Sequence, residues 1–134
     1  MSKIYYRAIK VWFILLIFMI FNGMIRNEFY QLRLGELLAH QLSTVIAIII
    51  VFIVTYIFLN KLKIKYSKEE LFTVGIIWLA STILFEFVFG YFVIGHSLER
   101  LLADYNIFAG RLWILFLIVT TTAPILINEF VKKT

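Results

Sequence analysis

The chain has 134 residues, of which 63% are apolar and only 16% are charged, and its net charge is +5. Soluble domains are about 45–50% apolar and about 25% charged, and a water-soluble fold of this length could not bury so much apolar surface. Composition therefore excludes a soluble enzyme, a soluble nucleic-acid-binding protein and a disordered chain, and it predicts an all-α polytopic membrane protein.

Four continuous apolar runs follow one another, over residues 8–25, 42–59, 71–94 and 112–127. About 20 helical residues cross a 30 Å hydrocarbon core, and the fourth run approaches that length if its helix starts at residue 108. Continuous rather than alternating hydrophobicity favours helices over barrel strands. The sequence predicts one domain over residues 1–134, an antiparallel bundle of four transmembrane helices at about 8–25, 42–59, 71–94 and 108–127.

The first run follows the basic residues Lys3, Arg7 and Lys10, as the apolar part of a signal peptide would. Cleavage would require small residues at alternate positions, and Phe21 breaks that pattern. We therefore expect an uncleaved first transmembrane helix. The connection after it, residues 26–41, mixes leucines with charges, which predicts a short interfacial helix or an early start of the second helix.

The distribution of Lys and Arg predicts the orientation in the membrane. The connection at residues 60–70 is short and basic, and within it Ser67 and Glu70 have capping-box spacing for the third helix. With both termini inside, the inside cations are Lys3, Arg7, Lys10, Lys61, Lys63, Lys65, Lys68, Lys132 and Lys133. The outside cations are Arg26, Arg33, Arg100 and Arg111. This excess predicts N-in, C-in topology and contact of the cations with anionic lipid.

Glu86 is the one charged residue within the third run, and it lies about 12 Å from the outer end of that run by helical rise. A charge at mid-bilayer costs of order 2.5–3.5 kcal/mol, so a glutamate there faces protein or water, has a partner, or is protonated. Two interpretations remain open: a structural polar contact with a neighbouring helix or subunit, and a site that handles a proton or a ligand.

Further polar residues follow Glu86 in the outer connection. At 100° per residue, Thr82, Glu86 and Gly90 share one line, and a helix continuing past Gly95 would add later residues to it. An outward-facing pocket for a ligand or proton would then comprise Glu86, His96, Glu99, Arg100, Asp104 and Arg111. The alternative is a loop that is polar because it meets water and whose charges pair locally.

Aromatic residues of the predicted helices fall into two groups. Trp12 and Trp113 are placed like interfacial anchors near helix ends. Trp78 lies well inside the third run, where packing in the core or against lipid is expected. In the fourth run, the threonines at 120–122 and Pro124 predict a bend in which a threonine hydroxyl meets a freed carbonyl.

Asn22 and Arg26 lie one turn apart at the outer end of the first helix. We expect Arg26 to extend to the lipid headgroups, with the Glu86 region as the alternative. His40 is expected at the interface, with a place in a pocket as the alternative. The chain has no cysteine, which excludes disulfides and thiolate metal sites, and it has no Glu-x-x-His spacing. The sequence therefore predicts no metal and no cofactor.

Three short segments carry a resemblance to a known family: Phe-Glu-Phe-Val-Phe-Gly at 85–90, Gly-His-Ser-Leu-Glu-Arg-Leu-Leu-Ala-Asp-Tyr-Asn at 95–106, and Gly-Arg-Leu-Trp at 110–113. Together they resemble a small bacterial membrane-protein family, an uncharacterised group of four-helix inner-membrane proteins. The resemblance implies a multi-pass protein of the bacterial inner membrane, and it implies no reaction.

The leading functional hypothesis is a small oligomeric transport or permeation protein with Glu86 as its intramembrane site. The alternative is a non-catalytic subunit or assembly factor of a larger membrane complex, in which Glu86 docks a partner helix. A third is a surface enzyme acting on lipid headgroups, with His96 and Asp104 or Glu99 as acid and base; a non-enzyme is favoured. The partners expected are the lipid bilayer and a second copy or another membrane protein, and no nucleic acid.

Overall fold

The computed structural model describes residues 3–103 and 113–131, and helices account for most of them. The longer helices are α1 (Lys3–Ile25), α3 (Glu36–Lys61), α4 (Lys68–Val88) and α6 (Trp113–Asn128). Three stretches are long and apolar enough to cross a membrane, at Lys3–Leu34, Glu36–Lys61 and Lys68–Val93. α6, with 16 residues, is a shorter apolar helix, and the predicted start of this helix at residue 108 lies outside the described residues.

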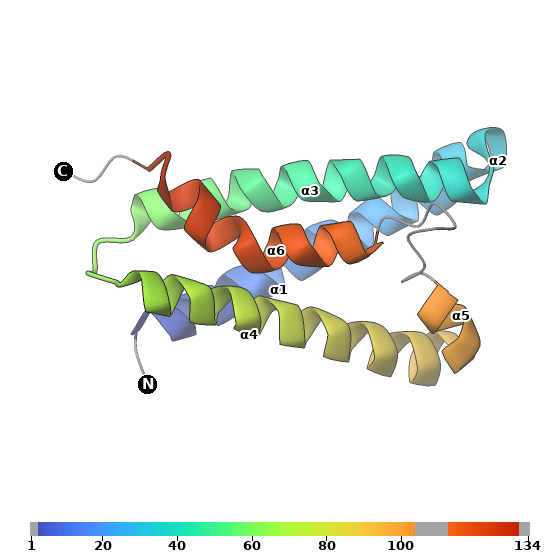
Figure 1. Cartoon of the computed structure of the whole chain (residues 1–134). Coiled ribbons are helices and arrows are strands. Elements are labelled where there is room, and N and C mark those ends of the chain that lie inside the picture. Colours follow the sequence, from blue (N-terminus) through green and yellow to red (C-terminus); the bar gives the residue numbers. More distant parts are fainter. Residues whose placement is uncertain (1–2, 104–112, 132–134) are drawn as a thin grey trace.

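The helices pack so that α1 and α6 each contact both α3 and α4. In Figure 1, α6 lies in front of the space between α3 and α4, and α1 lies behind it. Successive long helices run in opposite directions along the molecule. The 62–67 connection therefore lies at the same end as the start of α1 and the end of α6, and the connection between α1 and α3 lies at the other.

The core is centred on Trp78, for which the sequence had left packing in the core and packing against lipid both open. The side chains of Ile4, Leu59, Leu71 and Trp78 are at most 1% exposed. The indole Nε1 of Trp78 donates a hydrogen bond of 2.9 Å to the carbonyl oxygen of Ala8, so the buried N–H is satisfied. This contact joins α4 to α1 through the core.

Gly75 marks a close approach of α4 and α6. A Cβ atom placed on Gly75 would lie 1.9 Å from the carbonyl oxygen of Thr121. Small residues let the backbones of membrane helices approach closely, and here van der Waals packing takes the place of water exclusion as a source of stability. Apolar side chains on the outside, such as Phe13 and Ile17, are about half exposed, as lipid-facing residues would be.

The first two helices are longer than their apolar runs. α1 begins at Lys3 rather than near residue 8, and it continues through a π-helical turn, η1 (Arg26–Tyr30), into α2 (Gln31–Leu34). Gly35, with φ +84°, separates α2 from α3, which starts at Glu36 rather than near residue 42. A helix pairs its backbone N–H and C=O groups whether or not its side chains are apolar, so it can extend beyond the apolar run. The length of an apolar run therefore underestimates the length of the helix. The segment 26–41 thus contains a short helix and also an early start of the second long helix, the two alternatives that the sequence left open.

The start of α4 is the capping box that the spacing predicted. Ser67 Oγ accepts from the backbone N–H of Glu70 at 3.1 Å, and Glu70 Oε1 accepts from the N–H of Ser67 at 3.0 Å. Beside it, the hydroxyl of Tyr66 donates to Asn128 Oδ1 at 2.6 Å and ties this connection to the end of α6. Exposed Lys63 and Lys65 occupy the same connection.

The helix that contains Glu86 does not continue to Arg100. α4 passes into a π-helical turn, η2 (Phe89–Ile94), and stops at Gly95, whose φ of +87° is left-handed. A separate short helix, α5 (Leu98–Ala103), follows. The π-helical turn has i→i+5 bonding, so residues beyond Phe89 leave the line of an ideal α-helix. The alignment that extended from Glu86 into the outer connection is therefore wrong.

α6 changes direction in its second half, as the threonines and Pro124 predicted (Figure 1). Pro124 lacks the N–H that would bind the carbonyl of Thr120. The threonine hydroxyls do not meet that carbonyl: those of Thr120 and Thr121 donate to the carbonyls four residues earlier, at 2.9 and 2.8 Å. Such local bonds satisfy the hydroxyls within their own helix.

Candidate functional site

A cavity of about 280 Å³ lies between α1, α3, α4 and α6. Its lining residues on α4, and all but Val51 of those on α3, lie in the halves of these helices that are remote from the 62–67 connection (Figure 1). The polar side chains that line it come from all four helices: Asn22, Arg26, His40, Ser43, Thr44, Thr82, Glu86, Trp113 and Thr120. Apolar and aromatic side chains make up the rest of the wall, which is the composition typical of a small-molecule site.

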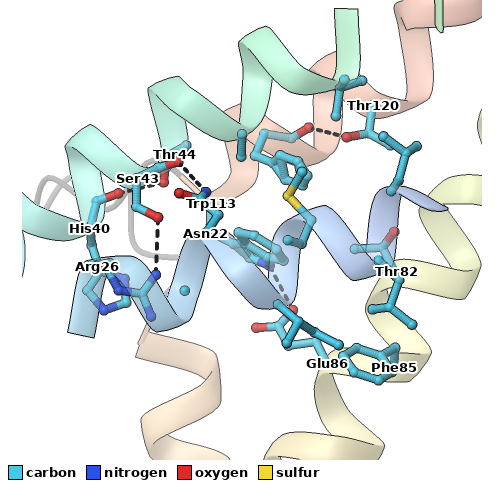
Figure 2. A pocket seen from close by; sticks show the side chains of 18 of the residues that line it. Asn22, Arg26, His40, Ser43, Thr44, Thr82, Phe85, Glu86, Trp113 and Thr120 are labelled. Carbon is cyan, nitrogen blue, oxygen red and sulfur yellow. Dashed lines mark hydrogen bonds between the residues drawn. The ribbon is translucent and has the colours of Figure 1, made fainter. Parts of the chain in front are cut away.

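Glu86 lies in the wall of this cavity and is half-buried. The indole Nε1 of Trp113, in the first turn of α6, donates to Glu86 Oε2 at 2.7 Å (Figure 2). The bond links α4 to α6 and fixes one carboxylate oxygen. Glu86 makes further contacts as well.

Trp12 and Trp113, which the sequence predicted to be interfacial anchors, both line the cavity. Trp113 binds Glu86, and the Nε1 of Trp12 donates to the hydroxyl of Thr82 at 3.1 Å. Thr82 in turn donates to the carbonyl of Trp78 at 2.7 Å. An indole has a large apolar body and one N–H, and an acceptor within the bundle satisfies that N–H as well as water would. The sequence does not reveal which acceptors on other helices bind the N–H groups of Trp12 and Trp113.

A second polar group lies at the end of the cavity nearest α2. The side-chain amide of Asn22 donates to the carbonyl of Ser43 at 2.9 Å, joining α1 to α3. Arg26 donates from Nε to Asn27 Oδ1 at 3.1 Å and from Nη1 to Ser43 Oγ at 3.4 Å. His40 lines the same end (Figure 2). Arg26 and His40 thus both line the cavity, and these two hydrogen bonds of Arg26 are to Asn27 and Ser43 rather than to Glu86.

The structure does not gather the six predicted site residues into one described cluster. Glu86 lines the cavity, whereas His96 and Glu99 follow the helix end at Gly95 and are not among its lining residues. The backbone N–H of His96 donates to the carbonyl of Gly90 at 2.8 Å, and Glu99 is exposed. Arg100 belongs to α5. Asp104 and Arg111 lie outside the described residues.

Apart from His40, sequence reasoning missed the contribution of α3 to the site. Ser43 and Thr44 line the cavity, and only their position near the start of the second run could have indicated this. Asn22, an amide inside an apolar run, was the clearest available signal. Within residues 3–103 and 113–131, no group of three or more His, Asp or Glu side chains could hold a metal ion.

Comparison with protein-family models, with characterised proteins and with solved structures gives no match to this chain.

Proposed function

We propose that the chain is a multi-pass protein of the bacterial inner membrane, in which all four long helices cross the bilayer and both ends lie inside. The support is threefold: three helices of sufficient length, exposed apolar side chains between their ends, and lysines gathered at one end of the molecule. α6 is short, and a tilted or locally thinned bilayer would accommodate it.

We further propose that the protein is a small transport or permeation protein, acting as an oligomer, with Glu86 as its proton- or ligand-binding residue. The observation that carries this proposal is the placement of Glu86 in a cavity to which all four helices contribute. Intramembrane carboxylates that face a cavity are typical of substrate and proton pathways. A purely structural glutamate would need only its contact with Trp113 and its neighbours, without a cavity beside it.

The experiment is a proton-flux measurement in liposomes. Purified protein is reconstituted into liposomes that contain a pH-sensitive dye, and a potassium gradient with valinomycin supplies the driving potential. We expect wild type to carry protons faster than protein-free liposomes. Glu86→Gln should lower the rate to that of protein-free liposomes, because the amide cannot exchange a proton.

Glu69→Gln is the matched control for this experiment. Glu69 is exposed in the first turn of the same helix, at the opposite end from the cavity, so the same chemical change should leave the flux unaltered. Size-exclusion chromatography checks that both variants fold. Equal flux through wild type and Glu86→Gln would contradict the proposal, as would wild-type flux no faster than that of empty liposomes.

The alternative role, as a non-catalytic subunit of a larger membrane complex, has a separate test. Purification of tagged protein in a mild detergent, with the mass and chain content determined, distinguishes the two. A stoichiometric foreign chain whose recovery falls in Glu86→Gln would favour the subunit role. A uniform self-assembly would favour the oligomeric transporter.

A further inference from the structure

We infer that the cavity holds one acyl chain of a bilayer phospholipid, which enters from the side between α1 and α4. This inference deepens the proposed function by naming the substrate class, and it rests on that proposal for the role of the cavity. Three observations carry it: the elongated shape of the cavity, the separation of its polar and apolar walls, and its opening on the lipid-facing surface.

The cavity is long and narrow. Along α1 its lining runs from Trp12 to Arg26, which is about 21 Å by helical rise. Along α3 it runs from His40 to Val51, which is about 16 Å. A volume of about 280 Å³ drawn out over such a length is slender. A single unbranched chain therefore suits its shape better than a compact or ring-shaped molecule does.

The polar and apolar side chains of the wall lie at different levels. The end nearest α2 has Asn22 and Arg26 from α1 and His40 and Ser43 from α3. The remainder is lined mainly by apolar side chains from all four helices: Leu15, Leu16, Met19, Ala47, Val51, Phe85 and Phe116. In the proposed orientation the polar end lies near the headgroups and the apolar part lies towards the middle of the bilayer. A phospholipid has its polar and apolar parts in the same order.

Thr82, Glu86 and Thr120 are the polar side chains within the apolar part. The hydroxyls of Thr82 and Thr120 donate to carbonyls of their own helices, at 2.7 and 2.9 Å. One carboxylate oxygen of Glu86 accepts from Trp113 at 2.7 Å, and Glu86 makes further contacts within the molecule. Polar groups that already have partners in the protein can lie beside an apolar chain at a smaller cost than groups without partners.

The cavity meets the lipid-facing surface between α1 and α4. Ile20 of α1 lines the cavity and is also 45% exposed. Deeper in the bundle the two helices are joined, because Trp12 donates to Thr82 and its ring meets that of Phe85 edge to face at 6.4 Å. Beyond this level α1 and α4 diverge (Figure 1). A phospholipid on this side can place one chain between the helices while its other chain stays in the bilayer.

The test uses a phosphatidylcholine that carries a photoactivatable diazirine near the middle of one acyl chain. The full chain is reconstituted into vesicles of unlabelled phosphatidylcholine that contain a small fraction of this probe. After illumination, mass spectrometry maps the residues that have reacted. Phosphatidylcholine has no net charge, so the exposed lysines of the 62–67 connection do not concentrate it.

The wild-type protein alone gives a decisive pattern. We expect adducts on Leu15 and Phe116, which line the cavity and are only 4% and 3% exposed. Phe13 and Ile17 face outward and should react with surrounding lipid in any case. Leu71 is buried outside the cavity lining and should stay unlabelled. This comparison does not depend on the folding of any variant.

A pair of variants locates the chain. Ala47 is buried in the cavity wall, so Ala47→Leu narrows the cavity. We expect it to reduce the adducts on Leu15 and Phe116 by at least roughly fivefold and to leave those on Phe13 unchanged. Ala80→Leu is the matched control, because Ala80 is exposed on α4 and lies outside the cavity lining. Size-exclusion chromatography checks that both variants fold.

Three results would overturn the inference: wild-type adducts confined to outward-facing residues, labelling of Leu71 equal to that of Leu15, or cavity labelling that Ala47→Leu does not reduce. If any of these occurs while proton flux still depends on Glu86, this inference fails and the transport proposal stands. Cavity labelling without Glu86-dependent flux would keep the ligand class and remove the transport role.

Discussion

Trp78 shows how one side chain can hold this molecule together. It is fully buried, it contacts Phe58 at a centroid distance of 6.2 Å, and its N–H binds the carbonyl of Ala8. Trp78→Phe would leave a cavity and remove this hydrogen bond, and we expect it to lower the free energy of unfolding by about 2–4 kcal/mol. Unfolding in mixed micelles with increasing SDS would measure this change.

Trp12→Phe serves as the comparison, because Trp12 is half-buried and donates to a side-chain hydroxyl rather than to a backbone carbonyl. We expect a loss of about 1 kcal/mol or less for this variant. Equal losses for the two variants would mean that Trp78 contributes no more to stability than a residue of the cavity wall.

At the residue scale, the sequence indicated that Glu86 needs a partner or a polar surrounding inside the membrane, and that Trp78 lies far from the ends of its helix. It could not predict which way Trp12, Trp113, Arg26 and His40 point. An amphipathic side chain near a helix end can satisfy its polar group in water, at the lipid headgroups or within the bundle. The choice depends on acceptors such as Glu86 and Ser43 on other helices, which the order of residues does not reveal.

At the scale of the helices, Gly75 sets the distance between α4 and α6. A methyl group here would collide with the backbone of Thr121, and a backbone oxygen cannot turn aside as a flexible side chain can. We expect Gly75→Ala to separate the two helices and to lower the free energy of unfolding by about 2 kcal/mol or more, despite the higher helix propensity of alanine. The same SDS titration measures the effect.

Gly23→Ala is the matched control for this helix contact. Among the described residues, a Cβ there would meet only the Arg26 guanidinium, at an ordinary 3.7 Å from Nη2. Helix propensity should then dominate, and stability should stay equal or rise by up to about 1 kcal/mol. A neutral Gly75→Ala would show that α4 and α6 can pack at a greater distance without loss.

The number and order of the apolar helices could be predicted from the sequence, because predominantly apolar runs of 16 or more residues admit few other structures. The capping box at Ser67 and Glu70 could be predicted as well, since it depends on two residues three positions apart. The π-helical turns at η1 and η2 could not. They change the hydrogen-bonding register without any change in hydrophobicity, and the register past Phe89 decides where His96 and Glu99 lie.

At the scale of the whole molecule, the orientation in the membrane can be tested directly because the chain has no native cysteine. Single substitutions Lys65→Cys and Glu28→Cys place thiols at exposed positions near opposite ends. With both termini inside, a membrane-impermeant thiol reagent applied to intact cells should label Glu28→Cys and leave Lys65→Cys unlabelled until the membrane is opened. Labelling of Lys65→Cys alone in intact cells would show the opposite orientation in the membrane.

The position of the buried Trp78 has a consequence for how a solute could cross. The cavity occupies one half of the helix assembly, and beyond Trp12 and Thr82 the interior is filled by Trp78, Ala8 and Phe58. A solute beside Glu86 would thus have travelled only part of the way. Completing the passage requires a second conformation, in which this indole moves and its bond to Ala8 breaks. The protein would then work as a gated carrier whose turnover is limited by that rearrangement, and not as an open channel.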